Sequence, residues 1–473
     1  MKQKVIYWFR QDLRLSDNPA LTQACQMGQI IPIYILDHRH AGDGKQGGAT
    51  CVWLHHALTS LHQDLDQKLL CYQADPIDIL QTLCQQHQVK HVYWNRCYEP
   101  WRMERDRDIK STLQATGIQV HSDNGSVLWE PWTIQKTDGT PFKVFTPFYR
   151  KGCLQADPPR QPLSKPGAMV LADIDNPKNT IDALNLLPKK FKWGQTLATH
   201  WNISEKGAHN QLQTFLSIGI KHYKEGRNFP AKPYTSQLSP YLRFGQISPN
   251  QVWHAALQLG NNADIDHFLS ELGWREFSYH LLYHNHQLPT QNLQPKFDRF
   301  PWQEDATKLA AWQTGNTGYP MVDAGMRQLW QTGYMHNRVR MIVGSFLVKN
   351  LLLHWHHGER WFWDCLVDAD MASNSASWQW IAGCGADAAP YFRVFNPITQ
   401  GQKFDPEGQY VKRFIPELKH LPGEFIHCPW QAPSLVLKAA GIQLGHHYPE
   451  PIVDVKASRQ AALDAFAALK QEQ

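Results

Sequence analysis

The chain has 473 residues, which at about 150 residues per domain predicts about three domains, or two large ones, and excludes a single small module. Hydrophobic residues make up 42% and charged residues 19%, so the chain can bury a core and is not disordered. Lys and Arg number 47 against 42 for Asp and Glu, and this small excess is weak evidence for a nucleic-acid partner. The 19 tryptophans favour an enzyme or a binding protein that uses aromatic surfaces.

The cysteine pattern indicates a reducing compartment. The nine cysteines form no CxxC pair and no zinc-like spacing, and an odd number argues against a disulfide framework. The N-terminal residues carry a charged or polar group every few positions, unlike a signal peptide. The most apolar stretch, residues 341–355, is shorter than the ~20 residues of a membrane span. We therefore expect a cytosolic protein without a membrane partner.

Short apolar runs alternate with helix-length segments over residues 1–130. This is the rhythm of a parallel sheet covered by helices, so we expect an α/β, Rossmann-like N-terminal domain. The first run is followed by residues 10–14, RQDLR, and not by GxGxxG, so the dinucleotide-binding fingerprint is missing and a purely structural sheet remains an alternative. The five predicted strands are residues 5–9, 30–36, 68–72, 91–95 and 117–121.

The rest of the chain is predicted to be a linker followed by a helical domain. Residues 131–200 are rich in Pro, Lys, Asp and Gly and show little period, as expected for an interdomain linker. Residues 201–473 show helical periodicity and few strand-like alternations, which predicts an all-α C-terminal domain. A ligand site in this domain, or between the two, is the default expectation. The expected helical stretches are 210–220, 267–282, 319–332, 336–355 and 360–365.

Common catalytic motifs are missing from the sequence. It contains no GxSxG, HExxH, Walker GxxxxGK[ST] or EF-hand motif, which argues against hydrolase and NTPase functions. Histidines cluster at His280, His284 and His286 and again over residues 354–357, but without Cys or carboxylates at ligand spacing. We expect these histidines to be satisfied by hydrogen bonds or solvent, and we expect no metal site.

Three hydroxyl residues, Thr235, Ser236 and Ser239, precede a predicted helix. Ser239 has the position of an N-cap and Pro240 that of the first helical residue. Ordinary helix capping is one interpretation. The other is a phosphate site, because free backbone N–H groups and the helix dipole at such an end favour an anion.

Asp368 and Asp370 stand beside a run of tryptophans in the sequence. Two carboxylates this close are costly to bury without cations or hydrogen-bond donors, and Arg338 and Arg340 are candidate cations. The tryptophans either pack the core or form an electron relay, for which the candidates are Trp302, Trp355 and Trp378.

Two helical segments carry further candidate binding residues. Glu271 and Trp274 fall on one helical face, either as part of a packed ion pair or as a ligand surface. Residues 335–341 offer Asn, two Arg and Met within about two turns, which suits phosphate and base contacts but also a buried polar network.

Six segments, in order along nearly the whole chain, together resemble the DNA photolyase/cryptochrome family, and specifically bacterial class I cyclobutane pyrimidine dimer photolyases. They are WFRQDLRLSDNPAL at 8–21, TSQLS at 235–239, ELGWREF at 271–277, TGYPMVDAGMRQL at 317–329, YMHNRVRM at 334–341, and DADMASNSASWQW to APYFRVFNP at 368–397. Any one of them is modest evidence, but six in order argue against chance similarity. The resemblance implies an N-terminal α/β domain of the antenna type and a helical domain that holds FAD in a U-shaped conformation.

The resemblance also implies which residues hold the FAD. Those expected near its phosphates are Tyr223, Thr235, Ser236, Gln237, Leu238 and Ser239. Those expected at the flavin end are Arg340, Asp368, Ala369, Asp370 and Asn374, with Arg340 paired to Asp368 and Asn374 facing the flavin N5.

The activity that the resemblance implies is light-driven DNA repair. Excited, reduced, anionic FAD passes an electron to a cyclobutane pyrimidine dimer, the ring splits and the electron returns. The partner is UV-damaged DNA, double- or single-stranded, and the dimer is flipped into a pocket walled by Trp274 and Trp380. Trp378, Trp355 and Trp302 would restore oxidised flavin to its reduced form. Residues implied at the lesion or DNA are Arg227, Glu271, Trp274, Arg275, Asn337, Arg338, Met341, Trp380, Gln400 and Lys403, with Glu271 bonded to a thymine edge.

Alternatives remain for substrate, signalling and antenna. Photolyases of the 6-4 photoproduct have two adjacent histidines where this chain has His336 and Asn337, which favours the cyclobutane dimer. A cryptochrome photoreceptor would use the same flavin site without repair. Glu104 matches a position that contacts a methenyltetrahydrofolate antenna, and a deazaflavin or a second flavin is the alternative. We expect a monomer in the bacterial cytosol.

Overall fold

The computed structural model describes residues 3–174, 178–188, 193–388 and 393–471. By their contacts the residues form two compact units. Unit 1 comprises residues 1–221, 236–286 and 367–372, and unit 2 comprises residues 222–235, 287–366 and 373–473. The domain limits expected from the sequence, at residues 130 and 200, remain a prediction, because a division by contacts joins segments that lie far apart in the chain.

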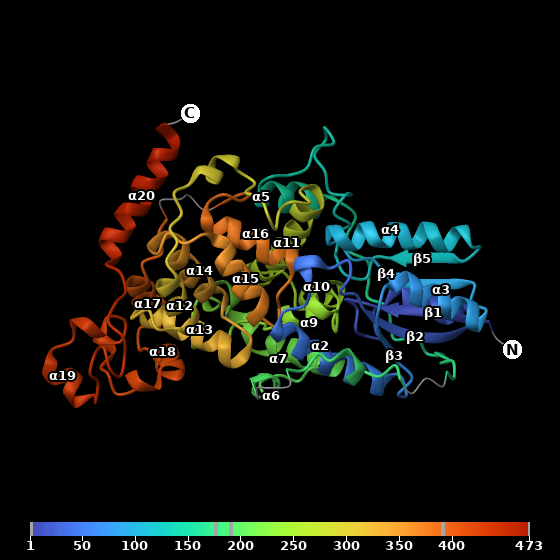
Figure 1. The fold of residues 1–473 in the computed structure, drawn as a ribbon, viewed down its shortest axis with the longest axis horizontal. Helices are drawn as coiled ribbons and strands as arrows, with labels where there is room; N and C mark the ends of the chain where they lie inside the picture. The colour runs from blue at the N-terminus through green and yellow to red at the C-terminus, as the bar shows by residue number, and fades with distance from the viewer. Residues whose placement is uncertain (1–2, 175–177, 189–192, 389–392, 472–473) are drawn as a thin grey trace. The chain divides into compact units, whose positions relative to one another are not determined.

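A five-stranded parallel sheet forms the N-terminal part of unit 1 (Figure 1). Its strands are β1 (Lys4–Phe9), β2 (Gln29–Leu36), β3 (Leu70–Gln73), β4 (His91–Asn95) and β5 (Gln119–Asp123), in the spatial order β3-β2-β1-β4-β5. Each neighbouring pair is parallel, and β1 and β2 pair from Lys4 with Gln29 to Phe9 with Tyr34. The predicted α/β class is confirmed, and each of the five predicted runs overlaps a strand.

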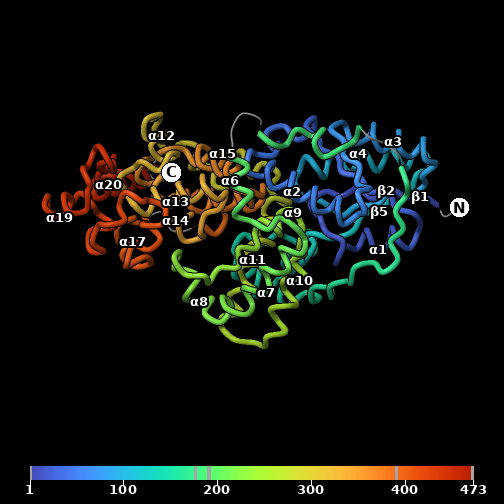
Figure 2. The backbone as a smooth tube through the Cα atoms, turned by 90° about the horizontal axis from the view of Figure 1, so that it is seen from below, coloured from blue at the N-terminus to red at the C-terminus, as the bar shows by residue number. Residues whose placement is uncertain are grey.

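Helices cover both faces of this sheet. α1 (Pro19–Met27) lies on one side and α3 (Pro76–His87) and α4 (Pro100–Ala115) lie on the other (Figure 2), while α2 (Gly48–Asp64) follows β2. β1 and β2 are buried along nearly their whole length, which explains why their sequences are continuous apolar runs and do not alternate. Trp8 and Ile33 of the sheet share one buried core with Leu80 of α3 and Leu113 of α4.

Unit 1 also contains helices from the predicted linker and helical regions. α11 (Ala263–His284) begins after Asn262, whose side chain accepts hydrogen bonds from the N–H groups of Asp264 and Ile265. Ser248 and Gln251 form a capping box at the start of α10. These helices are α5 (Phe145–Pro147), α6 (Trp193–Ala198), α7 (Glu205–Ser217), α9 (Ser239–Phe244), α10 (Pro249–Leu257) and α11 (Ala263–His284).

Unit 2 is mostly helical in its described part, which confirms the predicted all-α class. Among the residues with described structure, no helix is both long and apolar enough to cross a bilayer. The helices are α8 (Tyr223–Gly226), α12 (Ala306–Thr314), α13 (Pro320–Thr332), α14 (Asn337–Ser345), α15 (Trp355–Cys365), α16 (Met371–Ala382, which begins in unit 1), α17 (Pro397–Phe404), α18 (Gln409–Phe414), α19 (Ser434–Ala439) and α20 (Val455–Gln471).

The single helix predicted over 336–355 is wrong in its second half. α14 ends at Ser345, and one π-helical turn covers Phe346–Asn350. Leu352 then takes a positive φ of 54°, and the main-chain N–H of Gln303 donates to its carbonyl oxygen. A bulky residue in the left-handed region cannot continue a right-handed helix, so α15 begins only after the break. The apolar spacing continues through the break and therefore suggests one helix.

Candidate functional site

The loop before α9 carries the hydroxyl residues of unit 1. Gln237 has a positive φ of 51°, so the backbone turns sharply at this point. The Oγ of Ser236 accepts a hydrogen bond from the N–H of Leu238 at 3.4 Å, and the main-chain oxygen of Ser236 accepts one from Gln211 at 2.9 Å. The loop is therefore held from both sides.

Ser239 does not cap α9, contrary to the prediction. The helix starts at Ser239 itself, and Leu238 occupies the N-cap position without a side-chain hydrogen bond. The Oγ of Ser239 donates instead to Asp368 Oδ2 at 2.6 Å. A hydrogen bond to a carboxylate is stronger than one between neutral groups, which explains why the hydroxyl leaves the helix end uncapped.

Residues 368–370 are buried and bonded to two helices of unit 1. Tyr279 on α11 donates its hydroxyl to Asp370 Oδ2 at 2.7 Å, and Arg243 on α9 donates its Nε–H to the main-chain oxygen of Ala369 at 2.6 Å. Burial and the Asp370 carboxylate raise the pKa of Tyr279 well above its usual value, so the hydroxyl keeps its proton. Arg243 is 5% exposed, and its Nη1 has no hydrogen-bond partner among the described residues.

Arg275 and Glu276 on α11 form a part-buried ion pair, with 2.9 Å between Nη1 and Oε1. The guanidinium of Arg275 also lies 4.8 Å from the ring centroid of Tyr279. Glu276 accepts two more hydrogen bonds, from the main-chain N–H groups of Leu128 at 2.8 Å and Trp129 at 3.3 Å. Burial raises the pKa of Glu276 to about 7 against the effect of these donors. Arg275 is thereby fixed beside Tyr279.

Trp274, on the same helix, is half-buried and stacks on Phe145. The ring centroids are 3.8 Å apart and the planes differ by 10°. Glu271 lies one turn earlier, with its Oε1 4.0 Å from His267 Nε2. The predicted helix is confirmed, and the roles of Glu271 and Trp274 at a lesion stay predictions.

His336 caps α14 in unit 2. Its Nδ1 accepts a hydrogen bond from the N–H of Arg338 at 3.2 Å, so the proton of the neutral ring lies on Nε2. Burial lowers the pKa of His336 to about 3, helped by the positive charges of Arg227, Arg338 and Arg340. Three arginines around one neutral ring make this end of α14 strongly cationic.

Cationic side chains gather around Phe404, the last residue of α17. The guanidinium of Arg338 lies 4.6 Å from the Phe404 ring centroid, and the ammonium of Lys403 lies 5.2 Å from it. Arg338 also donates to Asn228 Oδ1 and approaches the sulfur of Met341 at 3.7 Å. Three of the predicted DNA-binding residues, Arg338, Met341 and Lys403, are thus brought together. We call Arg338, Lys403 and Phe404 the cationic cluster.

Arg227 and Arg340 each lie over a tyrosine ring. The guanidinium of Arg227 is 5.3 Å from the ring centroid of Tyr223, and that of Arg340 is 5.3 Å from the ring centroid of Tyr334. The Nε of Arg340 donates to the main-chain oxygen of Met335 at 2.8 Å. The predicted pairing of Arg340 with Asp368 stays a prediction.

Asn374 is buried on α16 and is oriented by α15. Its Nδ2 donates to the main-chain oxygen of Glu359 at 3.0 Å, and the Oγ of Ser375 donates to the carboxyl group of Glu359. Burial raises the pKa of Glu359 to about 7. The amide oxygen of Asn374 takes no part in this contact and is the end that remains for a ligand.

Unit 2 contains all three predicted relay tryptophans. Trp355 and Trp378 are buried, whereas Trp302 is half-buried. Trp378 packs edge-on against Trp312, with 6.3 Å between ring centroids. Trp302 and Trp355 both contact the ring of His354, at centroid distances of 5.1 Å and 5.6 Å. Their role in electron transfer stays a prediction.

The other predicted residues of unit 2 are Thr235, Asn337, Trp380 and Gln400. Asn337 is exposed at the first position of α14, while Thr235 and Trp380 are half-buried. The Oε1 of Gln400 on α17 is buried and has no hydrogen-bond partner among the described residues. Part of the last motif, residues 389–392, lies outside the described residues. The roles of these four residues stay predictions.

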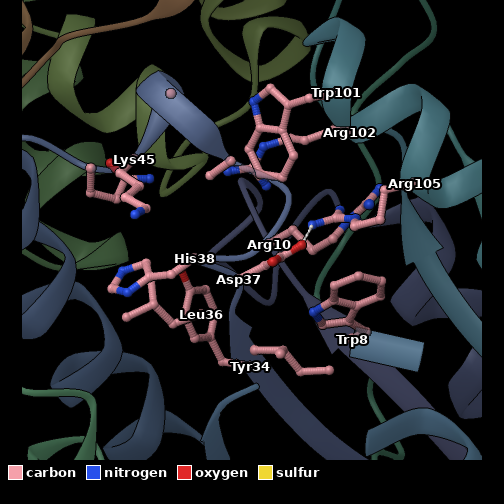
Figure 3. A pocket seen from close by; sticks show the side chains of 14 residues that line it. Trp8, Arg10, Tyr34, Leu36, Asp37, His38, Lys45, Trp101, Arg102 and Arg105 are labelled. Carbon is pink, nitrogen blue, oxygen red and sulfur yellow. Dashed lines mark hydrogen bonds and ion pairs between the residues drawn. The ribbon is translucent and has the colours of Figure 1, made fainter. Parts of the chain in front are cut away.

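A pocket opens at the carboxyl ends of β1 and β2 in unit 1 (Figure 3). The Nη1 of Arg105 donates to Asp37 Oδ2 at 3.1 Å, and the same guanidinium lies 5.0 Å from the ring centroid of Trp8 and 5.1 Å from that of Trp101. Buried polar atoms of the lining, Nε1 of Trp8 and Trp101 and Oε1 of Gln46, have no hydrogen-bond partner among the described residues. Such atoms indicate a ligand site.

Glu104, the predicted antenna residue, does not line this pocket. It is exposed on α4, whereas Trp101, Arg102 and Arg105 of the same helix do line the pocket. A contact between Glu104 and a second chromophore stays a prediction.

Two histidines of the clusters make hydrogen bonds with the main chain. The Nδ1 of His280 lies 3.2 Å from the main-chain oxygen of Pro131, and His354 caps α15. Among the residues whose placement is described, no group of three or more His, Cys, Asp or Glu could hold a metal ion.

Sequence reasoning misses the residues that orient the predicted ones: Arg243, Tyr279, His336 and Glu359. A signal exists for two of them. Arg243 lies four residues after Ser239, and Tyr279 lies four residues after Arg275, which places each pair on one helical face. Glu359 has no such signal, because it lies 15 residues from Asn374 and on a different helix.

Two family models match the chain. The model described as DNA photolyase matches residues 5–166, and the model described as the FAD binding domain of DNA photolyase matches residues 268–468. Together they span most of the 473 residues.

Individual proteins are similar over almost the whole chain. Deoxyribodipyrimidine photo-lyase of Agrobacterium fabrum is 47% identical over 99% of this chain and 98% of its own length, and cryptochrome-1 of Arabidopsis thaliana is 35% identical over 98% of this chain and 70% of its own length. The crystal structure of a bacterial class III photolyase from Agrobacterium tumefaciens matches with a TM-score of 0.95 and 46% identity, covering 100% of this chain and 98% of that one. The class I assignment expected from the motifs is therefore not supported. The chain belongs to the DNA photolyase/cryptochrome family, with an α/β domain and a helical FAD-binding domain.

Proposed function

We propose that this protein is a deoxyribodipyrimidine photolyase that splits cyclobutane pyrimidine dimers in DNA under light. The observation that carries the proposal is the buried segment 368–370, whose carboxyl groups accept hydrogen bonds from Ser239 and Tyr279 in a chain with a photolyase FAD-binding domain. These carboxyl groups are the ones expected at the flavin. The 47% identity to a deoxyribodipyrimidine photo-lyase supports the same activity.

The residues of unit 1 fit FAD by their chemistry. A diphosphate needs hydrogen-bond donors, and the turned loop 236–239 supplies hydroxyl and main-chain N–H groups. The buried Nη1 of Arg243 is a charged donor without a partner among the described residues, so an acceptor is needed beside it. Asp368 and Asp370 supply acceptors that are already fixed by Ser239 and Tyr279.

When bound and reduced, FAD would supply one electron on illumination for the opening of the cyclobutane ring and would take it back afterwards. The residues of the chain bind the cofactor and orient the groups around it. Tyr279 keeps its proton, because its pKa is raised, and holds Asp370 in one position. The main-chain oxygen of Glu359 fixes the amide of Asn374, and we propose that this neutral group, rather than a carboxylate, faces the flavin. Groups fixed in advance do not have to reorganise when charge moves.

We propose that the cationic cluster binds DNA phosphates beside the lesion. Arg338 and Lys403 lie over one ring, and Arg338 also approaches Met341, the predicted lesion contact. Trp274 and Trp380 are proposed to stack on the flipped dimer, and each stacked base contributes about 1–3 kcal/mol. Arg227, Glu271, Arg275, Asn337 and Gln400 are proposed as further DNA or lesion contacts.

We propose that the protein is of the class III type, which the 46% identity and the TM-score of 0.95 to a class III photolyase support. We also propose that it acts as a monomer on double- or single-stranded DNA in the bacterial cytosol.

We propose that the pocket at β1 and β2 holds a second, light-harvesting chromophore. Stacked guanidinium and indole groups favour a planar ring, and the unpartnered atoms of Trp8, Trp101 and Gln46 require both acceptors and a donor on it. A folate, a deazaflavin and a flavin all meet this description. Trp101→Ala is expected to remove a near-ultraviolet or blue absorption band while FAD stays bound, and an unchanged spectrum would refute the site.

The repair proposal is tested by mixing the reduced protein with thymine-dimer DNA and following the absorbance of restored thymines under blue or near-ultraviolet light. A dark sample is the control. Light-dependent recovery is expected. Bound FAD without recovery would refute dimer repair, and the same assay on DNA with a 6-4 photoproduct would then separate a 6-4 photolyase from a cryptochrome photoreceptor.

A further inference from the structure

Trp355, the middle tryptophan of the proposed relay, has a defined partner for its indole N–H. The side chain is fully buried, and its Nε1–H donates to Asn292 Oδ1 at 2.9 Å. Asn292 is half-buried, and its Nδ2–H donates in turn to Oδ1 of the exposed Asp298 at 2.7 Å. Two hydrogen bonds in series thus join the buried ring to a surface carboxylate.

Trp302, the outer tryptophan of the proposed relay, has a different environment. Its Nε1 is buried and has no hydrogen-bond partner among the described residues. Its ring packs on Phe300, with 4.4 Å between centroids, and on His354. Within the described part of the chain, the indole N–H of Trp302 therefore has no acceptor that could respond to a charge on the ring, whereas that of Trp355 has one.

The rings beside Trp355 are neutral histidines. Ring centroids of His356 and His354 lie 3.9 Å and 5.6 Å from that of Trp355. Burial lowers the pKa of both histidines to about 4, helped in each case by the positive charge of Arg360. Neither histidine therefore places a positive charge against Trp355 at neutral pH. The negative charge of Asp298 raises the pKa of His354, whereas the positive charge of Arg360 lowers it. Asp298 therefore acts electrostatically on the surroundings of Trp355.

We propose that Asn292, backed by Asp298, is a positioning residue that stabilises Trp355 when the ring has lost an electron. The inference rests on the proposed relay of Trp302, Trp355 and Trp378. Loss of an electron makes the indole N–H a stronger donor, so its bond to Asn292 strengthens as the charge develops. The bond from Asn292 to Asp298 polarises the amide and makes its oxygen a better acceptor.

The choice of an amide has a second consequence. An amide oxygen is too weak a base to remove the indole proton, so the oxidised ring keeps its proton on Nε1. The ring can therefore be reduced again without taking up a proton. In the proposed relay, Trp378 would give one electron to excited, oxidised flavin, Trp355 would reduce Trp378, and Trp302 would reduce Trp355, with an external thiol as the final donor. No bond is broken at Trp355.

Transient absorption after a laser flash tests the role of Asn292, because protonated and deprotonated indole radicals have different spectra. Asn292→Leu is expected to lower the yield of long-lived charge separation about three- to tenfold, the range that corresponds to one hydrogen bond. Asn292→Asp places a carboxylate on the indole N–H and is expected to give the deprotonated radical. Gln291→Leu, at the exposed neighbouring side chain, is the matched control and should behave as the parent.

Two further variants keep the outcome clear. Asp298→Asn changes only an exposed carboxylate and is expected to give a smaller loss of yield, so the test does not depend on the folding of Asn292→Leu. Parent-like yield and radical spectrum in both Asn292 variants would overturn the role of Asn292. Trp355→Phe separates the two proposals: loss of photoreduction in this variant supports the relay whatever the Asn292 variants do, and parent-like photoreduction would refute the relay and the inference with it.

Discussion

Replacing Tyr279 by phenylalanine is expected to loosen the segment 368–370 without opening a cavity. The change removes only the hydroxyl group, and the buried ring remains available to the guanidinium of Arg275. The bond that is lost runs to Asp370 Oδ2 at 2.7 Å. Asp370 is 7% exposed, so water does not easily replace the missing donor.

The size of the effect follows from the charge on the acceptor. A hydrogen bond to a charged group contributes about 1.5–3 kcal/mol, so the free energy of unfolding should fall by about this amount in Tyr279→Phe. If the whole loss is expressed in binding, the Kd of FAD rises about ten- to hundredfold. Burial and Asp370 hold the pKa of Tyr279 well above its usual value, so the loss should not change between neutral and mildly alkaline pH.

Urea unfolding at a fixed excess of FAD measures the first quantity, and titration of the protein with FAD measures the second. Tyr283→Phe is the matched control on α11, because that ring packs on Trp132 and its hydroxyl has no hydrogen bond among the described residues. A loss in Tyr279→Phe of less than about 0.5 kcal/mol, which is ordinary for surface substitutions, would refute the reasoning. So would an equal loss in Tyr283→Phe.

Three other changes test other parts of the molecule. Burial raises the pKa of Glu359 from its usual 4.5 to about 7, so the free energy of unfolding should be highest below about pH 4.5 and fall by about 3 kcal/mol as the pH rises through 7. Glu359→Gln should flatten this dependence in urea unfolding at several pH values, and an unchanged slope would assign it to other groups. Arg338→Ala should reduce the slope of log affinity for damaged DNA against log salt by about 1, as for one lost phosphate contact; an unaltered slope would remove Arg338 from the DNA surface. Trp302→Phe should slow photoreduction of oxidised flavin but spare repair by chemically reduced protein, and collapse of that repair would contradict the relay.

The sheet is predictable because its signal is local. β1 and β2 are continuous apolar runs, as expected of strands covered on both faces. Leu352 and Ser239 show where local signals stop. The positive φ of Leu352 accompanies a bridge between Gln303 and Leu353, and the hydroxyl of Ser239 bonds to Asp368, 129 residues away. Both contacts join segments that no period or capping rule connects.

The candidate site likewise contains residues that the sequence predicts and residues that it does not. Motifs identify residues such as Asn374 and Asp370, but not the groups that orient them, because Glu359 and Tyr279 act from other helices. The sequence does not predict the pocket of unit 1 for a similar reason. Its lining comes from β1, β2, the segment after β2 and α4, each of which contributes ordinary aromatic or charged residues to the sequence.

The route of the chain through the two units has a consequence for synthesis. Unit 1 is interrupted by residues 222–235 and 287–366 and is completed by the six residues 367–372. While the protein is being made on the ribosome, unit 1 therefore stays incomplete until Ala372 has emerged, by which time much of unit 2 exists as well. Folding one unit after the other during translation, the usual course for chains with contiguous domains, is not open to this protein. The core of the N-terminal sheet lies within residues 6–172 and is synthesised early, whereas α9 and α11 gain their contacts with residues 368–370 only at the end. A break at any point between residues 240 and 366 would therefore leave the residues of unit 1 proposed to bind the flavin on two separate fragments.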